Sequence, residues 1–281
     1  FVLAFIAAFD AGDRVALAAP GYPAYRNILL ALGIEPVSLP TGPESRFQPS
    51  VELLDQVDGK LDGLIVASPS NPSGTMLSAD ELRVLVDYCH DWDIRLISDE
   101  IYHGITYSMD EATALEFTDE AVVINSFSKY FSMTGWRIGW MVAPEDLLRS
   151  MECLQQNLFI SAPTLSQHAA LAAFDCADEL DANVASYARN RDILLNRLPA
   201  AGFADFAPAD GAFYLYADVS HLTGDAEAFC RRMLQETGVA TAPGNDFDPE
   251  RGRSFIRISF AGPTSDIEGA VARLEAWQGG R

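Results

Sequence analysis

The chain contains the stretch Ser126-Phe-Ser-Lys129-Tyr-Phe-Ser-Met-Thr-Gly-Trp-Arg137-Ile-Gly-Trp140, soon after the apolar run 121–124 (Ala-Val-Val-Ile). The β-branched residues of that run predict a strand that is buried on both faces of a sheet. A lysine just beyond the carboxyl end of such a strand lies where open α/β sheets bind their ligands. Lys60 and Lys129 are the only lysines in the chain. An amine that is useful when neutral is something that arginine cannot supply.

Other groups in the same stretch suit an anionic ligand. Ser126 and Ser128 provide small hydroxyl groups, and Arg137 provides a planar guanidinium that suits a phosphate. Taken alone, a solvated Lys129 in a turn after a strand explains the stretch equally well. The rest of the chain therefore has to distinguish a ligand-binding Lys129 from a solvated one.

Composition limits the class of protein. Of the 281 residues, 49% are hydrophobic and 21% charged, which is typical of a soluble globular enzyme. A net charge of −21 argues against a nucleic-acid-binding surface, which needs clustered Lys and Arg. The cysteines are scattered without a C-x-x-C pair, which fits a reducing cytoplasm, and the scattered histidines suggest no metal site. The cysteines are Cys89, Cys153, Cys176 and Cys230.

The apolar run 1–9 opens the chain without a methionine. It is too short to span a bilayer and lacks the charged lead of a signal peptide, so we expect no membrane segment here. The run resembles the middle of a buried helix. We therefore expect that the sequence is truncated at its N-terminus.

Strand and helix patterns alternate through the first part of the chain. We expect strands at 14–19, 34–39, 64–67, 94–98 and 121–124, and helices at 1–9, 25–32, 49–54 and 78–91. The last of these helices begins with a capping box, Ser78-Ala-Asp-Glu81. Alternation of this kind predicts an α/β fold of three layers, in which helices cover both faces of a mostly parallel sheet.

The pattern changes from about residue 147. Long helices are expected at 147–155, 164–174 and 179–198. They are followed by the apolar segment 212–216, a helix near 225–237, a strand at 255–259 and a final helix from about 265. This order predicts a smaller α+β domain. We place the boundary near residue 178, with a large domain at 1–178 and a small C-terminal domain at 179–281.

Polar signals follow the ends of several expected strands. Tyr22, Asn71, and Asp99 with Tyr102 come after three strands of the expected sheet. Each has an ordinary alternative: a packing aromatic in a proline turn, an Asx turn, or a solvated helix start. Arg257, in an apolar strand, could pair with a buried carboxylate. Together with the Lys129 stretch they place a lysine, arginines and a carboxylate at one edge of the sheet.

These segments resemble a known family. Ser-Phe-Ser-Lys129 with Gly-Trp-Arg137-Ile-Gly, Ser-Asp99-Glu-Ile-Tyr, Asn71-Pro-Ser-Gly and Arg257-Ile-Ser-Phe-Ala are similar to the class I aminotransferases of pyridoxal-phosphate fold type I. The likeness is greatest to the prokaryotic branch of aspartate and aromatic aminotransferases, and it covers essentially the whole chain. It implies that pyridoxal 5′-phosphate is the cofactor. It also implies that the protein is a homodimer, with an amino acid and a 2-oxo acid as substrates.

The resemblance also implies residue roles. Lys129 would form the Schiff base with the cofactor, Asp99 would pair with the pyridine nitrogen, and Tyr102 would bind the ring hydroxyl. Tyr22 would stack on the cofactor ring, and Asn71 would contact the ring hydroxyl and the substrate. The phosphate would be bound by Ser126, Ser128 and Arg137. Arg257 would bind the substrate carboxylate. In the family, the backbone amides of a loop before the first helix also bind the phosphate, and that loop would lie upstream of Phe1.

The chemistry requires these residue types independently. A Schiff base needs a lysine that can lose its charge, and the freed amine can then move a proton from Cα. An aspartate beside the ring nitrogen keeps an electron-withdrawing ring protonated. Three alternatives stay open: a C–S lyase or aminocyclopropane-carboxylate synthase on the same scaffold, the aminotransferase-like domain of a transcription regulator, and a catalytically silent protein.

Overall fold

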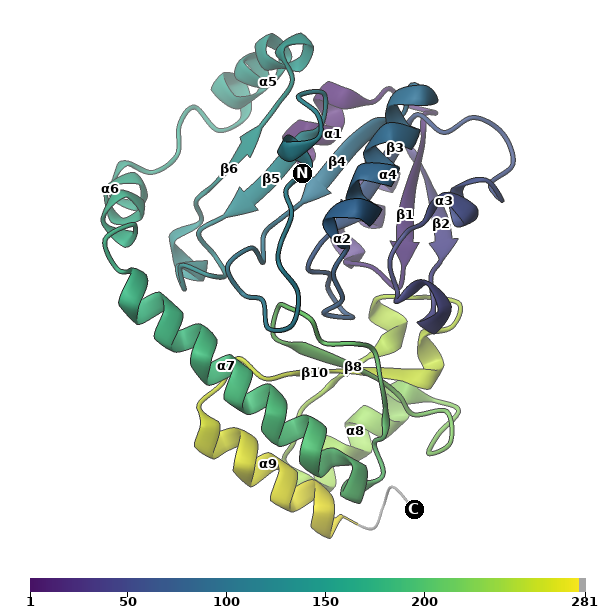
Figure 1. Ribbon diagram of the computed structural model, residues 1–281, viewed down its shortest axis with the longest axis vertical. Helices are drawn as coiled ribbons and strands as arrows, with labels where there is room; N and C mark the ends of the chain where they lie inside the picture. Colours follow the sequence, from purple (N-terminus) through teal and green to yellow (C-terminus); the bar gives the residue numbers. More distant parts are fainter. Residues whose placement is uncertain (278–281) are drawn as a thin grey trace.

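The computed structural model describes residues 1–277, and its larger sheet has six strands in the order β2-β1-β3-β4-β5-β6 (Figure 1). The strands are β1 (Arg14–Ala19), β2 (Glu35–Pro40), β3 (Gly63–Ala67), β4 (Arg95–Asp99), β5 (Val122–Ser126) and β6 (Gly139–Val142). Neighbouring strands run parallel, except that β6 is antiparallel to β5. The prediction of a mostly parallel sheet is confirmed.

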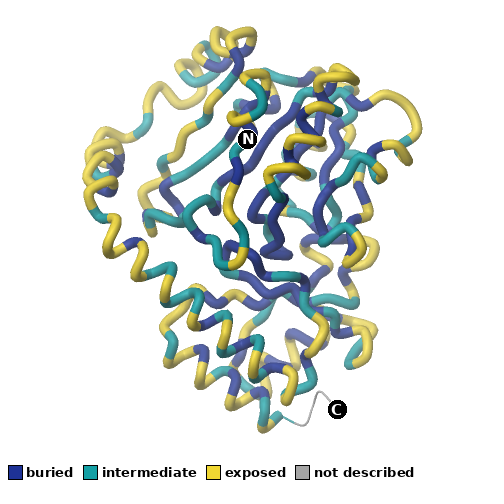
Figure 2. Tube along the Cα trace, viewed as in Figure 1, coloured by how far each residue is buried: buried dark blue, intermediate teal, exposed yellow. Residues whose placement is uncertain are grey.

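Helices cover both faces of this sheet. One face carries α1 (Val2–Ala8), α2 (Pro23–Ala31) and α5 (Glu145–Leu158), and the other carries α3 (Val51–Leu54) and α4 (Ala79–Asp91). Side chains alternate along each strand, so Ile65 of β3 packs in the first core and Leu64 and Val66 pack in the second. Figure 2 shows the central strands β1, β3 and β4 as mostly buried. The three-layer α/β arrangement is confirmed.

The start of α4 follows from its sequence. Ser78 Oγ accepts a hydrogen bond from the Glu81 backbone N–H at 3.3 Å, and the Glu81 carboxylate accepts one from the Ser78 N–H at 2.7 Å. This reciprocal cap satisfies two backbone donors that a helix leaves without partners. The helix then presents Leu82 and Leu85 to the sheet. The predicted capping box is confirmed.

A smaller antiparallel sheet lies below the larger one in Figure 1, with strand order β7-β8-β10-β9. Its strands are β7 (Asp205–Phe206), β8 (Tyr214–Asp218), β9 (Ala242–Pro243) and β10 (Phe255–Ser259). In the sequence, α6 (Thr164–Ala173) and α7 (Ala177–Arg197) connect the larger sheet to the smaller one. Helices α7, α8 (Ala226–Thr237) and α9 (Thr264–Ala276) pack beside the smaller sheet. The domain boundary near residue 178 stays a prediction, and it falls at the start of α7. None of the helices described in residues 1–277 is both long and apolar enough to cross a membrane.

Strand β6 is the main element that the sequence did not predict. Its four residues, Gly139–Val142, are mostly exposed and carry no run of buried apolar residues. Trp140 and Val142 are each about two-fifths exposed, at 40% and 42%. The strand begins where a β-carbon on Gly139 would lie 2.7 Å from the Asn125 carbonyl oxygen. Glycine is therefore required for β6 to approach β5 this closely.

The two sheets are joined by a buried carboxylate. Asp210, in the loop before β8, pairs with Arg46 at 2.6 Å and accepts hydrogen bonds from the Met76 N–H at 3.2 Å and Ser108 Oγ at 3.2 Å. Those three partners belong to loops around the larger sheet, beyond β2, β3 and β4. The carboxylate thus fixes the smaller sheet against the carboxyl edge of the larger one.

Candidate active site

The residues predicted for the site gather at the carboxyl ends of the central strands. Tyr22 follows β1, Asn71 follows β3, Asp99 ends β4, and Lys129 follows β5. Arg257 lies in β10 of the smaller sheet, where its guanidinium reaches Asn71. The chain therefore brings the predicted lysine, carboxylate and substrate-binding arginine into one region between the two sheets.

Lys129 extends its amine into an aromatic environment. Its Nζ lies 5.5 Å from the ring centroid of Tyr102 and 5.6 Å from that of Phe213. Desolvation lowers the pKa of Lys129, and the positive charge of Arg257 lowers it further. A lysine with a lowered pKa is more often neutral near pH 7, which is the form that attacks a carbonyl carbon.

Asp99 is a buried carboxylate, 3% exposed, at the end of β4. Burial raises the pKa of Asp99 to about 6, against hydrogen bonds that favour the ionised form. Those bonds come from the Tyr25 hydroxyl, which donates to Oδ2, and from the Ile101 backbone N–H at 3.2 Å from Oδ1. Asp99 can therefore be charged at neutral pH and is held in one orientation.

A chain of side chains connects Tyr102 with Asn71. The hydroxyl groups of Tyr102 and Tyr214 lie 2.9 Å apart. The Tyr214 ring lies against Arg257, whose Cζ is 4.4 Å from the ring centroid, and Arg257 Nη1 donates to Asn71 Oδ1 at 2.8 Å. Three of these four residues were predicted for the site. Tyr214 adds a contact that links them.

Arg257 keeps donor capacity beyond its contact with Asn71. Its Nε is buried and has no hydrogen-bond partner among residues 1–277. A buried N–H without a partner costs free energy, on the order of 1–3 kcal/mol, which a carboxylate in the site would recover. The guanidinium is therefore prepared for an anionic ligand.

Ser126 and Ser128 lie close together, beside the backbone of the residue that follows Arg137. Ser126 Oγ is 2.9 Å from Ser128 Oγ and accepts from the Ser128 N–H at 3.0 Å. Ser126 Oγ is also 3.1 Å from the carbonyl oxygen of Ile138, the residue after Arg137. Arg137 has a left-handed backbone (φ 50°) and donates through Nη1 to the Thr134 carbonyl at 2.8 Å. The remaining guanidinium donors and two hydroxyls are suited to a phosphate.

Tyr22 and Asn71 line the same small hollow, together with Tyr25 and Phe47. The Tyr22 ring is 40% exposed and meets the Tyr25 ring edge-on at a centroid distance of 5.4 Å. Tyr22 thus remains partly accessible to a ligand, and the Tyr25 ring packs against it edge-on. Its role as the stacking residue stays a prediction.

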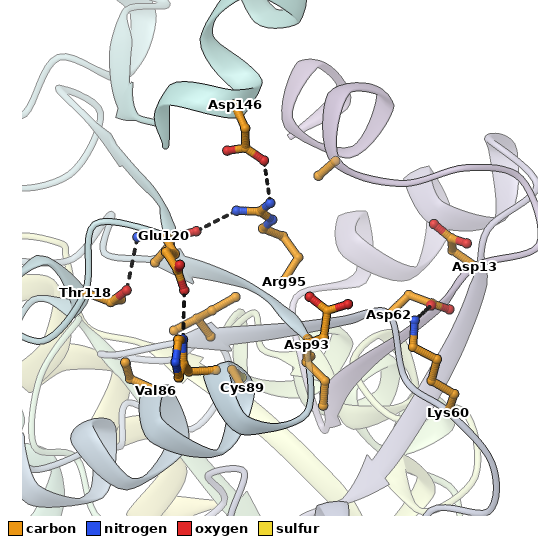
Figure 3. Close-up of a pocket in the computed structure, with 15 residues that line it drawn as sticks. Asp13, Lys60, Asp62, Val86, Cys89, Asp93, Arg95, Thr118, Glu120 and Asp146 are labelled. Carbon is orange, nitrogen blue, oxygen red and sulfur yellow. Dashed lines mark hydrogen bonds and ion pairs between the residues drawn. The ribbon is translucent and has the colours of Figure 1, made fainter.

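A larger hollow, of about 420 Å³, lies at the opposite edge of the sheet (Figure 3). Its charged side chains are mainly engaged with one another: Arg95 pairs with Asp146 at 2.7 Å and Lys60 with Asp62 at 3.0 Å. Lys60 is exposed there and does not approach the residues around Lys129. This hollow contains none of the predicted site residues.

Sequence reasoning missed four aromatic residues of the site: Tyr25, Phe213, Tyr214 and Phe247, the last with its ring centroid 4.7 Å from Arg257 Cζ. Tyr25 follows Tyr22 by three residues at the start of α2, a spacing that places both on one side of a helix and could have indicated it. Tyr214 and Phe247 belong to the smaller sheet and the turn beside β9. Nothing in the local sequence indicates that they meet the larger sheet.

Comparison with known proteins places this geometry in a family. A model of the family described as aminotransferase class I and II matches residues 1–274. The chain belongs to this family. The valine–pyruvate aminotransferase of Mycobacterium tuberculosis is 54% identical over 281 residues, which cover 99% of this chain and 72% of that protein.

Solved structures agree with this assignment. An aminotransferase from M. tuberculosis matches the class I/II aminotransferase described here with a TM-score of 0.97 at 54% identity, covering 98% of this chain and 72% of the other. The aspartate aminotransferase of Thermus thermophilus with maleate gives a TM-score of 0.90 at 30% identity, with 98% and 72% covered. The predicted family and fold are confirmed.

As a member of this family, the class I/II aminotransferase uses pyridoxal phosphate to move an amino group between an L-amino acid and a 2-oxo acid. The predicted activity and cofactor are confirmed. The residues present fit the cofactor: a desolvated lysine amine, a buried carboxylate, and two adjacent hydroxyls with a guanidinium from the same loop. The alternative activities considered from the sequence receive no support from these relatives.

Proposed function

We propose that this aminotransferase acts on a small apolar L-amino acid such as valine, with pyruvate as the oxo-acid partner. The 54% identity to the valine–pyruvate aminotransferase of M. tuberculosis supports this choice. The site supports it too, because the side chains around Lys129 and Arg257 are mainly aromatic. Apolar walls favour an apolar substrate side chain.

The distribution of positive charge carries the proposal that the substrate has one carboxylate. Arg257 and Arg137 are the two cations in residues 1–277 whose charge lowers the pKa of Lys129. In our assignment Arg137 binds the cofactor phosphate and Arg257 binds the α-carboxylate. Neither of these two arginines is then left for a second carboxylate.

We assign the cofactor contacts to residues that lie around Lys129. Lys129 would hold the cofactor covalently through Nζ, and Tyr22 would stack on its ring. Asp99 would pair with the ring nitrogen, because a buried carboxylate held by Tyr25 is ready to accept one hydrogen bond more. Tyr102 and Asn71 would meet the ring hydroxyl, and the phosphate would be bound by Ser126, Ser128 and Arg137.

Pyridoxal phosphate, when bound, supplies an electron-poor ring that takes up the electron pair left when the Cα–H bond breaks. Arg257 orients the substrate through its carboxylate, which fixes the position of Cα relative to Lys129. Lys129 Nζ, whose pKa is lowered chiefly by desolvation, would accept the Cα proton in its neutral form and later return it. Asp99 would keep the ring nitrogen protonated, and the rings of Tyr102 and Phe213 lie 5.5 and 5.6 Å from Nζ on an apolar side of the amine.

The experiment is a substrate panel in single-turnover format. The loaded enzyme is mixed with individual L-amino acids, and the fall of the cofactor's absorbance in its lysine-bound form is followed. Valine and other small apolar amino acids should convert the cofactor much faster than aspartate or glutamate. Faster conversion by dicarboxylic amino acids would contradict the substrate class, while the aminotransferase activity itself would stand.

We also propose that the enzyme is a homodimer located in the cytoplasm. Large apolar side chains on and beside α5 and α6 are well exposed, including Ile160 at 81% and Leu165 at 71%, and a second copy would cover them. All four cysteines are free, which suits a reducing compartment. Sedimentation velocity should give twice the mass of one chain. Leu165→Arg should shift the measured mass toward that of one chain.

A further inference from the structure

The carboxylate-binding arginine is weakly held by hydrogen bonds. The Arg257 side chain projects from the middle of β10. Its one hydrogen bond among residues 1–277 is from Nη1 to Asn71 Oδ1, at 2.8 Å. A single bond leaves the plane of a long, flexible side chain undetermined. A carboxylate, in contrast, is bound by two parallel N–H groups only if that plane is fixed.

Two aromatic rings supply the missing constraint. Arg257 Cζ lies 4.4 Å from the ring centroid of Tyr214 and 4.7 Å from that of Phe247. Both distances lie within the range at which a guanidinium is attracted to an aromatic face. The rings also exclude water from Nε, which is buried. An ion pair formed there would therefore be less screened than one at the surface.

Phe247 is itself held in place by both sheets. It is 7% exposed, and its ring lies 6.4 Å from that of Tyr216 in a small cluster that also contains Phe47, from a loop of the larger sheet. Its backbone oxygen accepts a hydrogen bond from the Gly21 N–H at 3.1 Å, next to Tyr22. The ring position thus depends on contacts made on both sides of the site.

The turn that carries Phe247 has little freedom. A β-carbon on Gly244 would lie 2.4 Å from the Gly252 carbonyl oxygen and 2.8 Å from the Phe255 β-carbon. The Phe247 N–H also donates to the Gly244 carbonyl at 2.9 Å. This close packing fixes the backbone from which the Phe247 ring projects.

We propose that Phe247 is a positioning residue for the reaction: it holds the guanidinium plane of Arg257 so that a substrate carboxylate is bound by two N–H groups. The inference rests on the proposed role of Arg257 as the α-carboxylate ligand. Phe247 acts through Arg257 and needs no contact with the reacting atoms. The ring, rather than apolar volume alone, is the feature that matters.

The test compares variants with and without the ring. Phe247→Leu and Phe247→Met keep an apolar side chain of similar size, and Phe247→Tyr keeps the aromatic face. Phe203→Leu is the matched control, because Phe203 is also buried, at 1% exposed, in the core of the smaller sheet and is not part of the site. Folding of each variant is checked by thermal denaturation.

The main measurement is calorimetric binding of propionate, a simple monocarboxylate, to the loaded enzyme, with propionamide as the uncharged comparison. The Leu and Met variants should bind propionate about three- to tenfold more weakly, the range expected when a cation–π contact is lost. Phe247→Tyr should stay within about twofold of the unmodified enzyme. KM for the amino acid and for the oxo acid should rise by the same factor as the dissociation constant, with kcat changed by less than about twofold.

Two outcomes would overturn the inference. One is that folded Phe247→Leu and Phe247→Met bind propionate as tightly as the unmodified enzyme. The other is that Phe203→Leu weakens propionate binding as much as they do. If Arg257→Lys leaves propionate binding unchanged, the proposed role of Arg257 fails, and that result is separate from either outcome at Phe247.

Discussion

Removing one hydroxyl group tests the electrostatics of the site. Tyr25→Phe keeps the buried ring and deletes the donor that binds Asp99 Oδ2. A hydrogen bond to a charged group is worth about 1.5–3 kcal/mol. At 1.36 kcal/mol per pKa unit, its loss should raise the Asp99 pKa by about one to two units. The pKa of this carboxyl, about 6 in the unmodified protein, should then lie above neutral pH.

The sign of the stability change follows from the same pKa. The folded pKa of Asp99, about 6, is above its ordinary value of 3.8. Protonation of Asp99 therefore stabilises the folded form, and this contribution is complete below pH 3.8. That contribution, on the order of 3 kcal/mol, is lost as the pH rises through 6. In Tyr25→Phe this stabilisation by protonated Asp99 should persist to higher pH and be lost only at about pH 7–8.

The assay is a carbon-13 NMR titration of aspartate-labelled protein without cofactor, with Asp99→Asn identifying the resonance. Single-turnover kinetics of the loaded enzyme provides a second reading, in which the acid limb of the rate should move to higher pH. Tyr88→Phe is the control, because it removes a comparable phenol–carboxylate bond, to Asp55 at 2.9 Å, on the surface. An Asp99 titration unchanged in Tyr25→Phe, or moved equally in Tyr88→Phe, would refute the reasoning.

Three further substitutions test the proposed roles. Lys129→Ala should abolish covalent attachment of the cofactor, and borohydride reduction of the unmodified enzyme followed by peptide mapping should label Lys129; a label on Lys60 would contradict the assignment. Asp99→Ala should leave the cofactor bound but slow Cα proton removal by several powers of ten in single-turnover kinetics, and a loss below about tenfold, ~1.4 kcal/mol, would exclude Asp99 as the ring partner. Arg257→Ala should raise KM for every amino-acid substrate and Arg257→Lys should recover little, because an ammonium lacks the planar fork; an effect confined to dicarboxylic substrates would assign Arg257 to the side chain instead.

Much of the larger sheet could be predicted because its signals are local. Each buried strand is a short apolar run, and its ligand-facing residue follows within a few positions, as with Asp99 after β4 and Lys129 after β5. Parallel strands bring their carboxyl ends to one edge, so sequence order alone places these side chains together. Arg257 was recognisable because a charged residue in an apolar strand needs a partner.

The remaining contacts depend on how the two sheets pack, which no local pattern records. Tyr214 and Phe247 flank Arg257 because β8 and β9 pair with β10 in the smaller sheet, and Arg257 reaches Asn71 only because that sheet faces the larger one. The left-handed backbone of Arg137 gives no sequence signal, since most such positions carry glycine or asparagine. Strand β6 escaped prediction because its exposed residues lack the buried, β-branched pattern of its neighbours.

The buried carboxylate that joins the two sheets has a consequence for the kinetics of folding. Asp210 is 164 residues from Arg46, 134 from Met76 and 102 from Ser108 along the chain. Closing loops of that length costs entropy that must be met before these contacts stabilise anything, so they should form after the folding barrier. Contacts of this kind chiefly slow unfolding. Asp210→Asn should therefore shorten the lifetime of the native enzyme in denaturant while its rate of folding stays nearly the same, so the persistence of the assembled active site over time depends on a residue that takes no part in its chemistry.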